Sequence, residues 1–233
     1  MISTMETLSQ SAVLITGASG GLGDSVARAF LDAGAGVAGV ARHWRESPEH
    51  PRFVPVEAEL TSPDGCRHAV ERTVDAFSRL DAVVHLMGGF AMEGDVQNTR
   101  IETLDHMLNL NVRSAYMIFQ EAIPRFTGAG GRILAIGALG GVTPAAGLSA
   151  YAASKAALHA LILTLAAEGR KHGYTANAIL PSIIDTPANR KAMPGADFGT
   201  WVKPESIAAQ LVFLASDAGA DTTGALIPMA GRV

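Results

Sequence analysis

A tyrosine and a lysine stand four residues apart in the run Tyr-Ala-Ala-Ser-Lys, residues 151–155. On a helix this spacing places the side chains of Tyr151 and Lys155 on one face. A free phenol has a pKa of about 10, and a neighbouring ammonium favours the phenolate, so the lysine would move the tyrosine toward a useful acid–base range. The pair therefore predicts proton transfer to or from a substrate through Tyr151.

A glycine-rich turn, Thr-Gly-Ala-Ser-Gly-Gly-Leu-Gly over residues 16–23, follows an apolar run and precedes a helical pattern. In that context glycines let the backbone approach a pyrophosphate at the positive end of a helix. The spacing is not the common G-x-G-x-x-G pattern. On its own the turn is equally compatible with cofactor binding and with an ordinary tight turn.

The end of the second predicted strand indicates which nicotinamide cofactor is used. An acid at this place would bind the ribose hydroxyls of NAD and repel a 2′-phosphate, whereas the chain reads Ala41-Arg42-His43. Arg42 could be only a solvated loop cation, but the missing acid favours a pairing with the 2′-phosphate. We therefore expect NADP(H) to be preferred, with NAD(H) possible.

Short β-rich runs alternate with longer helical patterns along the chain, which predicts crossover helices and a parallel sheet. Gly34 and Gly169 are expected to end helices. The expected fold is a single-domain α/β structure of the Rossmann type, a doubly wound parallel sheet with helices on both faces. The predicted strands cover residues 12–16, 36–41, 53–56, 82–86, 132–136 and 176–180, and the predicted helices cover 22–33, 63–79, 101–119, 151–168 and 204–216.

Residues 1–233 are expected to form one nucleotide-binding domain, because no repeat, linker or composition break divides them. The one long irregular stretch, residues 186–202, is rich in Pro, Gly and Met. It leaves the predicted carboxyl end of a strand, where ligands bind in such folds. We expect a substrate lid there, with a plain loop as the alternative.

Composition limits the partners. The net charge is −4 with no basic block, so neither a nucleic acid nor an anionic membrane is expected. Cys66 is the only cysteine, which excludes an internal disulfide and a thiolate-rich metal site and fits a reducing compartment. Residues 1–10 lack signal-peptide features, and no apolar run reaches the roughly 18 residues of a membrane span. A cytoplasmic protein is predicted.

Taken together, the Thr-Gly-x-x-x-Gly-x-Gly turn and the Tyr-x-x-x-Lys pair resemble the short-chain dehydrogenase/reductase family, and the resemblance extends to Thr223-Gly224. It implies hydride transfer between a nicotinamide cofactor and a small-molecule substrate, with Tyr151 and Lys155 at the chemical step and at the cofactor. It also implies a homodimer or homotetramer. By the same resemblance Gly17, Gly21 and Gly23 shape the turn, and Ser19 and Leu22 face the diphosphate. Glu59 and Leu60 are expected to flank the adenine, and Ile184 and Thr186 to hold the nicotinamide carboxamide. Asn111 is expected to position the lysine through a water molecule.

The chain departs from the family pattern at two places. His-Leu-Met-Gly, residues 85–88, stands where the family has Asn-Asn-Ala-Gly, so only Gly88 is retained. The family serine thirteen residues before the tyrosine is replaced by Ala138, which follows Gly137. Thr143 or Ser149 could supply the missing hydroxyl from elsewhere in the fold.

Residues 180–201 are similar to dihydropteridine reductases within the family, which also lack the serine. Those enzymes differ from this chain in carrying an acid after the second strand and preferring NADH. The leading hypothesis is hydride transfer to a C=O or C=N centre, with pteridine-like compounds as the most specific suggestion. Two alternatives remain open: a nucleotide-binding regulatory protein with weakened catalysis, and an ordinary ketone or alcohol dehydrogenase in which another hydroxyl replaces the serine.

Overall fold

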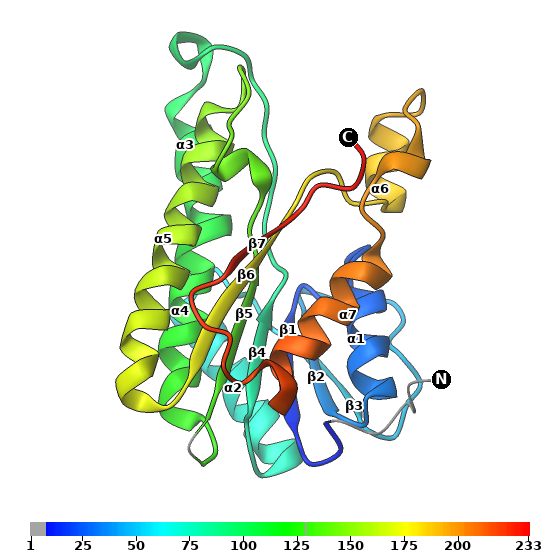
Figure 1. The fold of residues 1–233 in the computed structure, drawn as a ribbon, viewed down its shortest axis with the longest axis vertical. Helices are drawn as coiled ribbons and strands as arrows, with labels where there is room; N and C mark the ends of the chain where they lie inside the picture. The colour runs from blue at the N-terminus through cyan, green and yellow to red at the C-terminus, as the bar shows by residue number, and fades with distance from the viewer. Residues whose placement is uncertain (1–7, 129) are drawn as a thin grey trace.

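The computed structural model describes residues 8–128 and 130–233 and contains one seven-stranded parallel sheet (Figure 1). Residues 1–7, on which much of the signal-peptide expectation rests, lie outside the described part. The strand order is β3-β2-β1-β4-β5-β6-β7, so the predicted doubly wound sheet of the Rossmann type is confirmed. The strands are β1 (Ala12–Thr16), β2 (Gly36–Ala41), β3 (Phe53–Glu57), β4 (Ala82–His85), β5 (Arg132–Ile136), β6 (Thr175–Pro181) and β7 (Leu226–Met229).

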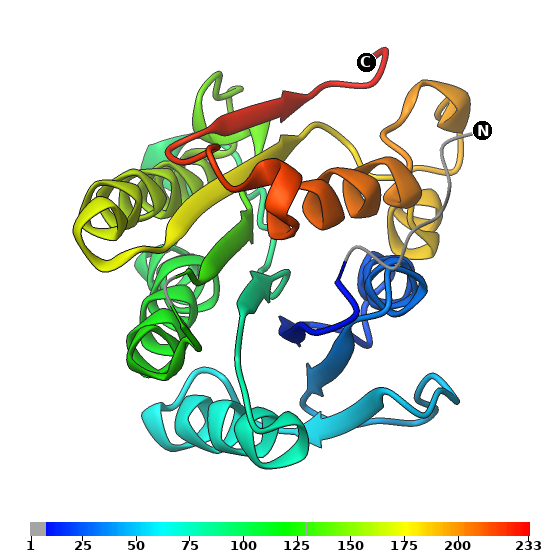
Figure 2. The ribbon, with the colours of Figure 1, turned by 60° about the horizontal axis from the view of Figure 1, so that its bottom comes forward.

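Helices cover both faces of the sheet, which buries its apolar strands on each side (Figure 2). One layer holds α1 and α7, and the other holds α2, α4 and α5. The helices are α1 (Gly23–Asp32), α2 (Pro63–Phe77), α3 (Ile101–Leu108), α4 (Ser114–Ala122), α5 (Ser149–His172), α6 (Pro187–Ala192) and α7 (Pro204–Ala215); short helical turns are η1 (Val96–Asn98), η2 (Asn109–Arg113), η3 (Ile123–Arg125), η4 (Leu139–Gly141), η5 (Phe198–Thr200) and η6 (Asp217–Gly219).

The sheet reverses its winding between β1 and β4, which pair side by side although β2 and β3 separate them in sequence. In such sheets a crevice opens at the carboxyl ends of the strands on either side of this point. The turn after β1 and the segments after β4, β5 and β6 all begin at this edge. The fold therefore brings the motifs found in the sequence to one place.

The predicted helix over residues 101–119 is present, because α3, the π-helical turn η2 and α4 follow one another without a break in helical conformation. One helix prediction is wrong. Gly169 was expected to end a helix but lies buried inside α5, which ends at His172 and is capped by Gly173 in the left-handed conformation (φ 81°). Gly34, with φ 87°, does follow the end of α1 as predicted.

By length and composition α5 is long and apolar enough to cross a membrane, so the expectation that no apolar run reaches that length is wrong. Its packing identifies it as a core helix of the domain. Leu158, Ile162 and Leu165 lie in the same hydrophobic cluster as Ala176 of β6. The helix owes its apolar character to this contact with the sheet.

Gly169 provides a test of the packing of α5 on the chain that follows it. A Cβ at this position would fall well inside contact distance of the Tyr174 carbonyl. We expect Gly169→Ala to lower the free energy of unfolding by about 1–3 kcal/mol, measured by urea titration. Gly195→Ala is the control, because an added Cβ there meets no atom within 4 Å. Equal stability of the two variants would contradict this packing.

Candidate active site

The turn after β1 requires glycine at two places. Gly17 has φ +68°, and a Cβ there would lie 3.0 Å from the Met87 nitrogen. A Cβ at Gly23 would collide with the Ala18 carbonyl. Helix α1 begins at Gly23, and no side chain caps its N-terminus. The N–H groups of Gly23 and Asp24 bond back to the Gly20 carbonyl (2.9 and 3.4 Å), so it is the positive end of the helix dipole that favours an anionic ligand here.

Six of the residues predicted to hold the cofactor line one cavity of about 600 Å³ beside this turn. They are Gly17, Ser19, Arg42, Glu59, Leu60 and Gly88. Leu22 directs its side chain into the core beneath α1, and a Cβ at Gly21 would lie 3.0 Å from the side chain of Thr186. The glycine turn, the N-terminus of α1 and the Arg42 cation fit the shape and charge of a dinucleotide.

His85 takes a position where the family carries an asparagine, and it is fully buried. Its Nδ1 lies 3.0 Å from Thr16 Oγ1, which also accepts hydrogen bonds from the N–H groups of Leu86 (3.1 Å) and Met87 (3.2 Å). Burial lowers the pKa of His85 to about 3, helped by the charge of Lys155. A neutral imidazole thus links the ends of β1 and β4.

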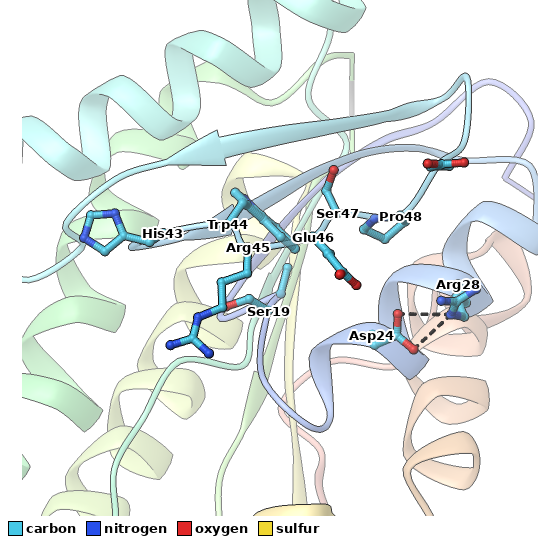
Figure 3. A pocket seen from close by; sticks show the side chains of 11 residues that line it. Ser19, Asp24, Arg28, His43, Trp44, Arg45, Glu46, Ser47 and Pro48 are labelled. Carbon is cyan, nitrogen blue, oxygen red and sulfur yellow. Dashed lines mark hydrogen bonds and ion pairs between the residues drawn. The ribbon is translucent and has the colours of Figure 1, made fainter.

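A second cavity, of about 740 Å³, lies between α1 and the segment after β2 (Figure 3). Ser19 and Arg45 both line it, and Asp24 pairs with Arg28 on its far side (2.9 Å). Arg42 borders the adjoining cavities with Ser19 and Glu59. The sequence pattern indicates Arg42 but not Arg45, because only the folded loop brings this second arginine to the cavity that Ser19 lines.

An acid that no sequence motif indicates, Glu57, also lies at this end of the site. Glu57 ends β3 and borders the same cavity as Arg42 and His43. Its carboxylate accepts a hydrogen bond from the Trp44 N–H (2.8 Å) and lies 3.6 Å from His43 Nδ1. Glu57 therefore fixes the loop that carries the two arginines.

Asn111 is fully buried in η2, and its side-chain amide holds the segment after β4. Oδ1 accepts the N–H of Gly89 (2.8 Å), while Nδ2 donates to the Gly89 carbonyl (3.1 Å) and to Ser154 Oγ (2.9 Å). We call this set of bonds the Asn111 clamp. The predicted water-mediated contact to Lys155 stays a prediction, whereas the clamp itself is a finding of the structure.

Tyr151 and Lys155 lie on one face of α5 as predicted, at the crevice. Lys155 is buried, its Nζ donates to the Ile136 carbonyl (2.9 Å), and burial lowers its pKa to about 8. The expectation of a lowered tyrosine pKa is wrong for this structure, because burial raises the pKa of Tyr151 to about 12. Such a phenol keeps its proton at neutral pH, which suits a proton donor.

Ala138, the residue in place of the family serine, is buried, and its N–H donates to His159 Nε2 (3.3 Å). Neither hydroxyl suggested as a replacement bonds to Tyr151. Thr143 Oγ1 donates to the Leu139 carbonyl (3.3 Å), and Ser149 Oγ lies 3.5 Å from Thr99 Oγ1. The exposed ring of Phe90 instead stands edge-on to Tyr151, with ring centroids 4.9 Å apart.

The segment after β6 is more ordered than the irregular stretch expected from the sequence. Thr186 caps α6 by accepting the Asn189 N–H (3.3 Å), and the Ile184 carbonyl accepts Asn189 Nδ2 (2.8 Å). The side chain of Asp185 pairs with Arg190 and with Lys203 (2.6 Å), and both hydrogen bonds hold the pKa of Asp185 well below its usual range. These ion pairs fix the two ends of the segment together.

Comparisons with known proteins agree with this geometry. The family model described as enoyl-(acyl carrier protein) reductase matches residues 17–231. The chain belongs to the short-chain dehydrogenase/reductase family. An uncharacterized oxidoreductase of Mycobacterium tuberculosis is 31% identical over 242 residues, covering 94% of this chain and 89% of the relative. The protein is thus an NAD(P)-dependent oxidoreductase of this family.

Two solved structures of the family carry different cofactors. A 3-ketoacyl-(acyl-carrier-protein) reductase from Brucella melitensis, complexed with NADH, has 26% identity and a TM-score of 0.86, with 95% and 98% of the two chains covered. A short-chain dehydrogenase from Burkholderia cenocepacia, in complex with NADP, has 29% identity and a TM-score of 0.83, with 97% and 98% covered. The family therefore determines the cofactor class but not the choice between NADH and NADPH.

The lowered pKa of Lys155 predicts an alkaline limit to activity in this short-chain dehydrogenase/reductase. Its ammonium loses its charge as the pH rises through about 8, whereas Tyr151 keeps its proton until about pH 12. We expect kcat/KM for reduction to fall above pH 8. Lys155→Arg, which keeps its charge, should lack this fall in its residual activity. A wild-type profile that is flat to pH 10 would contradict the assignment.

Proposed function

We propose that this protein reduces a planar, conjugated C=N or C=O compound with NADPH, and that a pteridine-like ring system is its most specific candidate substrate. The observation that carries the proposal is the surroundings of Tyr151. A buried alanine takes the place of the family serine, and an exposed aromatic ring stands beside the phenol. The site thus combines a flat apolar surface with a single hydroxyl donor.

Phe90 supports a flat substrate. Its side chain is 64% exposed, as is that of Met92 in the same segment. The Asn111 clamp holds Gly89, the residue just before Phe90, by both its N–H and its carbonyl. An exposed ring in a fixed position is suited to stacking against a conjugated ring system. The resemblance of residues 180–201 to dihydropteridine reductases is an expectation from the sequence alone, and it would favour the same substrate class.

The bound cofactor would supply a hydride at nicotinamide C4. Tyr151 would donate the proton from its Oη to the substrate atom that gains electron density, and Lys155 would stabilise the charge left on the phenolate. Lys155 would also help to hold the cofactor, and Ile184 and Thr186 would hold its carboxamide. The segment over residues 186–202, joined at its base through Asp185, would cover the substrate as a lid.

The missing serine decides between substrate classes. In the reduction of a simple ketone, negative charge develops on oxygen, and a hydroxyl donor contributes a few kcal/mol of stabilisation. Ala138 offers no hydroxyl, and its N–H is bonded to His159. A quinonoid dihydropterin spreads the added electron density over ring nitrogens and depends less on that donor. The absence of a hydroxyl at position 138 therefore favours a conjugated substrate over an ordinary ketone.

The substrate proposal is tested with a quinonoid dihydropterin and with cyclohexanone. We expect wild type to show the higher kcat/KM for the dihydropterin, and Ala138→Ser to raise kcat/KM for cyclohexanone by about tenfold or more with little change for the dihydropterin. Phe90→Ala should raise KM for the dihydropterin alone.

Tyr151→Phe is the control for that experiment and should lower turnover of both substrates by roughly a hundredfold while NADPH still binds. Efficient reduction of cyclohexanone without dihydropterin turnover would favour an ordinary ketone reductase. Tight NADPH binding without turnover of either compound would favour a regulatory nucleotide-binding protein. Both results would reject the proposed substrate class.

The cofactor preference rests on Arg42 and Arg45. We expect NADPH to bind more tightly than NADH, and Arg42→Ala to weaken NADPH binding by roughly tenfold while NADH binding stays unchanged. Arg45→Ala should act in the same direction, and Arg72→Ala, an exposed change on α2, is the matched control. Fluorescence titration measures all three. NADH binding as tight as that of NADPH would show that the arginines are only solvated loop cations.

The cytoplasmic location and the homodimeric or homotetrameric state stay predictions. Tyr116 of α4 and Leu163 of α5 are large apolar side chains exposed on the surface, at 56% and 45%. They are candidates for contact with another subunit.

A further inference from the structure

His159 is a buried imidazole that neither the sequence motifs nor the proposed mechanism uses. It is 4% exposed and lies on the same face of α5 as Tyr151 and Lys155, one helical turn beyond the lysine. Its Nε2 accepts the N–H of Ala138 (3.3 Å). In this arrangement the imidazole bonds to the residue that stands in place of the family serine.

Two glycines create the space that the imidazole fills. A Cβ at Gly137 would fall well inside contact distance of His159 Nε2, and a Cβ at Gly141 would lie 2.6 Å from His159 Cε1. Neither glycine has a positive φ, so their backbone conformation does not require glycine. Gly137 leaves room chiefly for the His159 imidazole, whereas Gly141 leaves room both for that ring and for the backbone of α5, since its Cβ would lie 3.0 Å from the Ala156 nitrogen. A serine side chain at position 137 would collide with the imidazole.

The bond from Ala138 has a counterpart two residues earlier. Lys155 Nζ donates to the Ile136 carbonyl (2.9 Å), so two side chains of α5 hold the backbone on either side of Gly137. The Ile136 carbonyl is the hydrogen-bond acceptor that the structure shows for the Lys155 ammonium. Any shift of this strand end would therefore move the atom that positions the charge.

We propose that His159 is a positioning residue: by holding the end of β5 through Ala138, it fixes the Ile136 carbonyl and thereby the Lys155 ammonium. The imidazole occupies the place that Gly137 and Gly141 leave open, and it organises the strand end in the absence of the serine. The proposal rests on the proposed role of Lys155 in holding the cofactor.

The protonation state of His159 agrees with this role. Only a neutral imidazole has a lone pair on Nε2 that can accept the Ala138 N–H. Burial, with a contribution from the Lys155 charge, lowers the pKa of His159 to about 4. The ring is therefore an acceptor at neutral pH and adds no second positive charge beside the lysine.

The test is a double-mutant cycle read out by the Kd for NADPH, with circular dichroism to confirm folding. His159→Met removes the acceptor and should weaken NADPH binding by roughly tenfold, whereas His159→Gln keeps an acceptor and should stay within about twofold of wild type. In the Lys155→Met background, His159→Met should have no further effect, because His159 acts through the lysine.

Additive losses in the Lys155→Met background would overturn this proposal and leave the proposed function intact. Unchanged NADPH binding in Lys155→Met alone would overturn the role of Lys155 and this proposal with it.

Gly137→Ala tests the same unit if His159→Met does not fold. The added Cβ displaces the imidazole without changing it, so it should weaken NADPH binding in the wild-type background and not in Lys155→Met. Gly140→Ala is the matched control in the same turn, because its Cβ would meet the nearest atom, Tyr151 Cε1, at an ordinary 3.6 Å. Equal Kd values for these two variants in the wild-type background would contradict the proposal.

Discussion

The ammonium group of Lys155 is a buried positive charge, and the groups around it are arranged to tolerate it. Removing a charge from water is costly unless hydrogen bonds replace the lost solvent. The Ile136 carbonyl supplies one such bond, and the nearby imidazoles of His85 and His159 both have pKa values lowered far enough to stay neutral. Gly88 follows from the same constraint, because a Cβ there would lie 3.4 Å from Lys155 Nζ.

The π-helical turn η2 is the second device that shapes the site. It places the Asn111 amide inside the fold, where it binds both polar groups of Gly89 and the hydroxyl of Ser154. One buried side chain thus joins the segment after β4 to α5, and π-helical turns of this kind often occur at functional sites. A Cβ at Gly88 would lie 2.7 Å from Asn111 Oδ1 and 3.4 Å from Lys155 Nζ. Gly88 therefore lies between the Asn111 clamp and the Lys155 ammonium and leaves room for both.

The sequence predicted the features that depend on local pattern: six strands, the glycine turn, and the face shared by Tyr151 and Lys155. It missed β7, a four-residue strand with a proline that shows no alternation of polar and apolar side chains. It placed a helix end at Gly169, because the sequence does not distinguish a glycine that is needed for close packing against Tyr174 from a glycine that ends a helix. The raised pKa of Tyr151 could not be predicted from the sequence either, because the burial that raises it depends on the whole fold. The helical spacing of His159 after Lys155 was visible, but its glycine partners could be found only in space.

Ala138, in the place of the family serine, is part of a packed unit at the end of β5. Gly137 and Gly141 provide space, His159 fills it, and the Ala138 N–H donates to the imidazole rather than to a substrate oxygen. Such a site stabilises the position of its lysine at the cost of a donor for developing negative charge. A substrate that spreads the added electrons over a conjugated ring depends less on that missing donor. The packing around Ala138 is therefore consistent with the conjugated substrate proposed above.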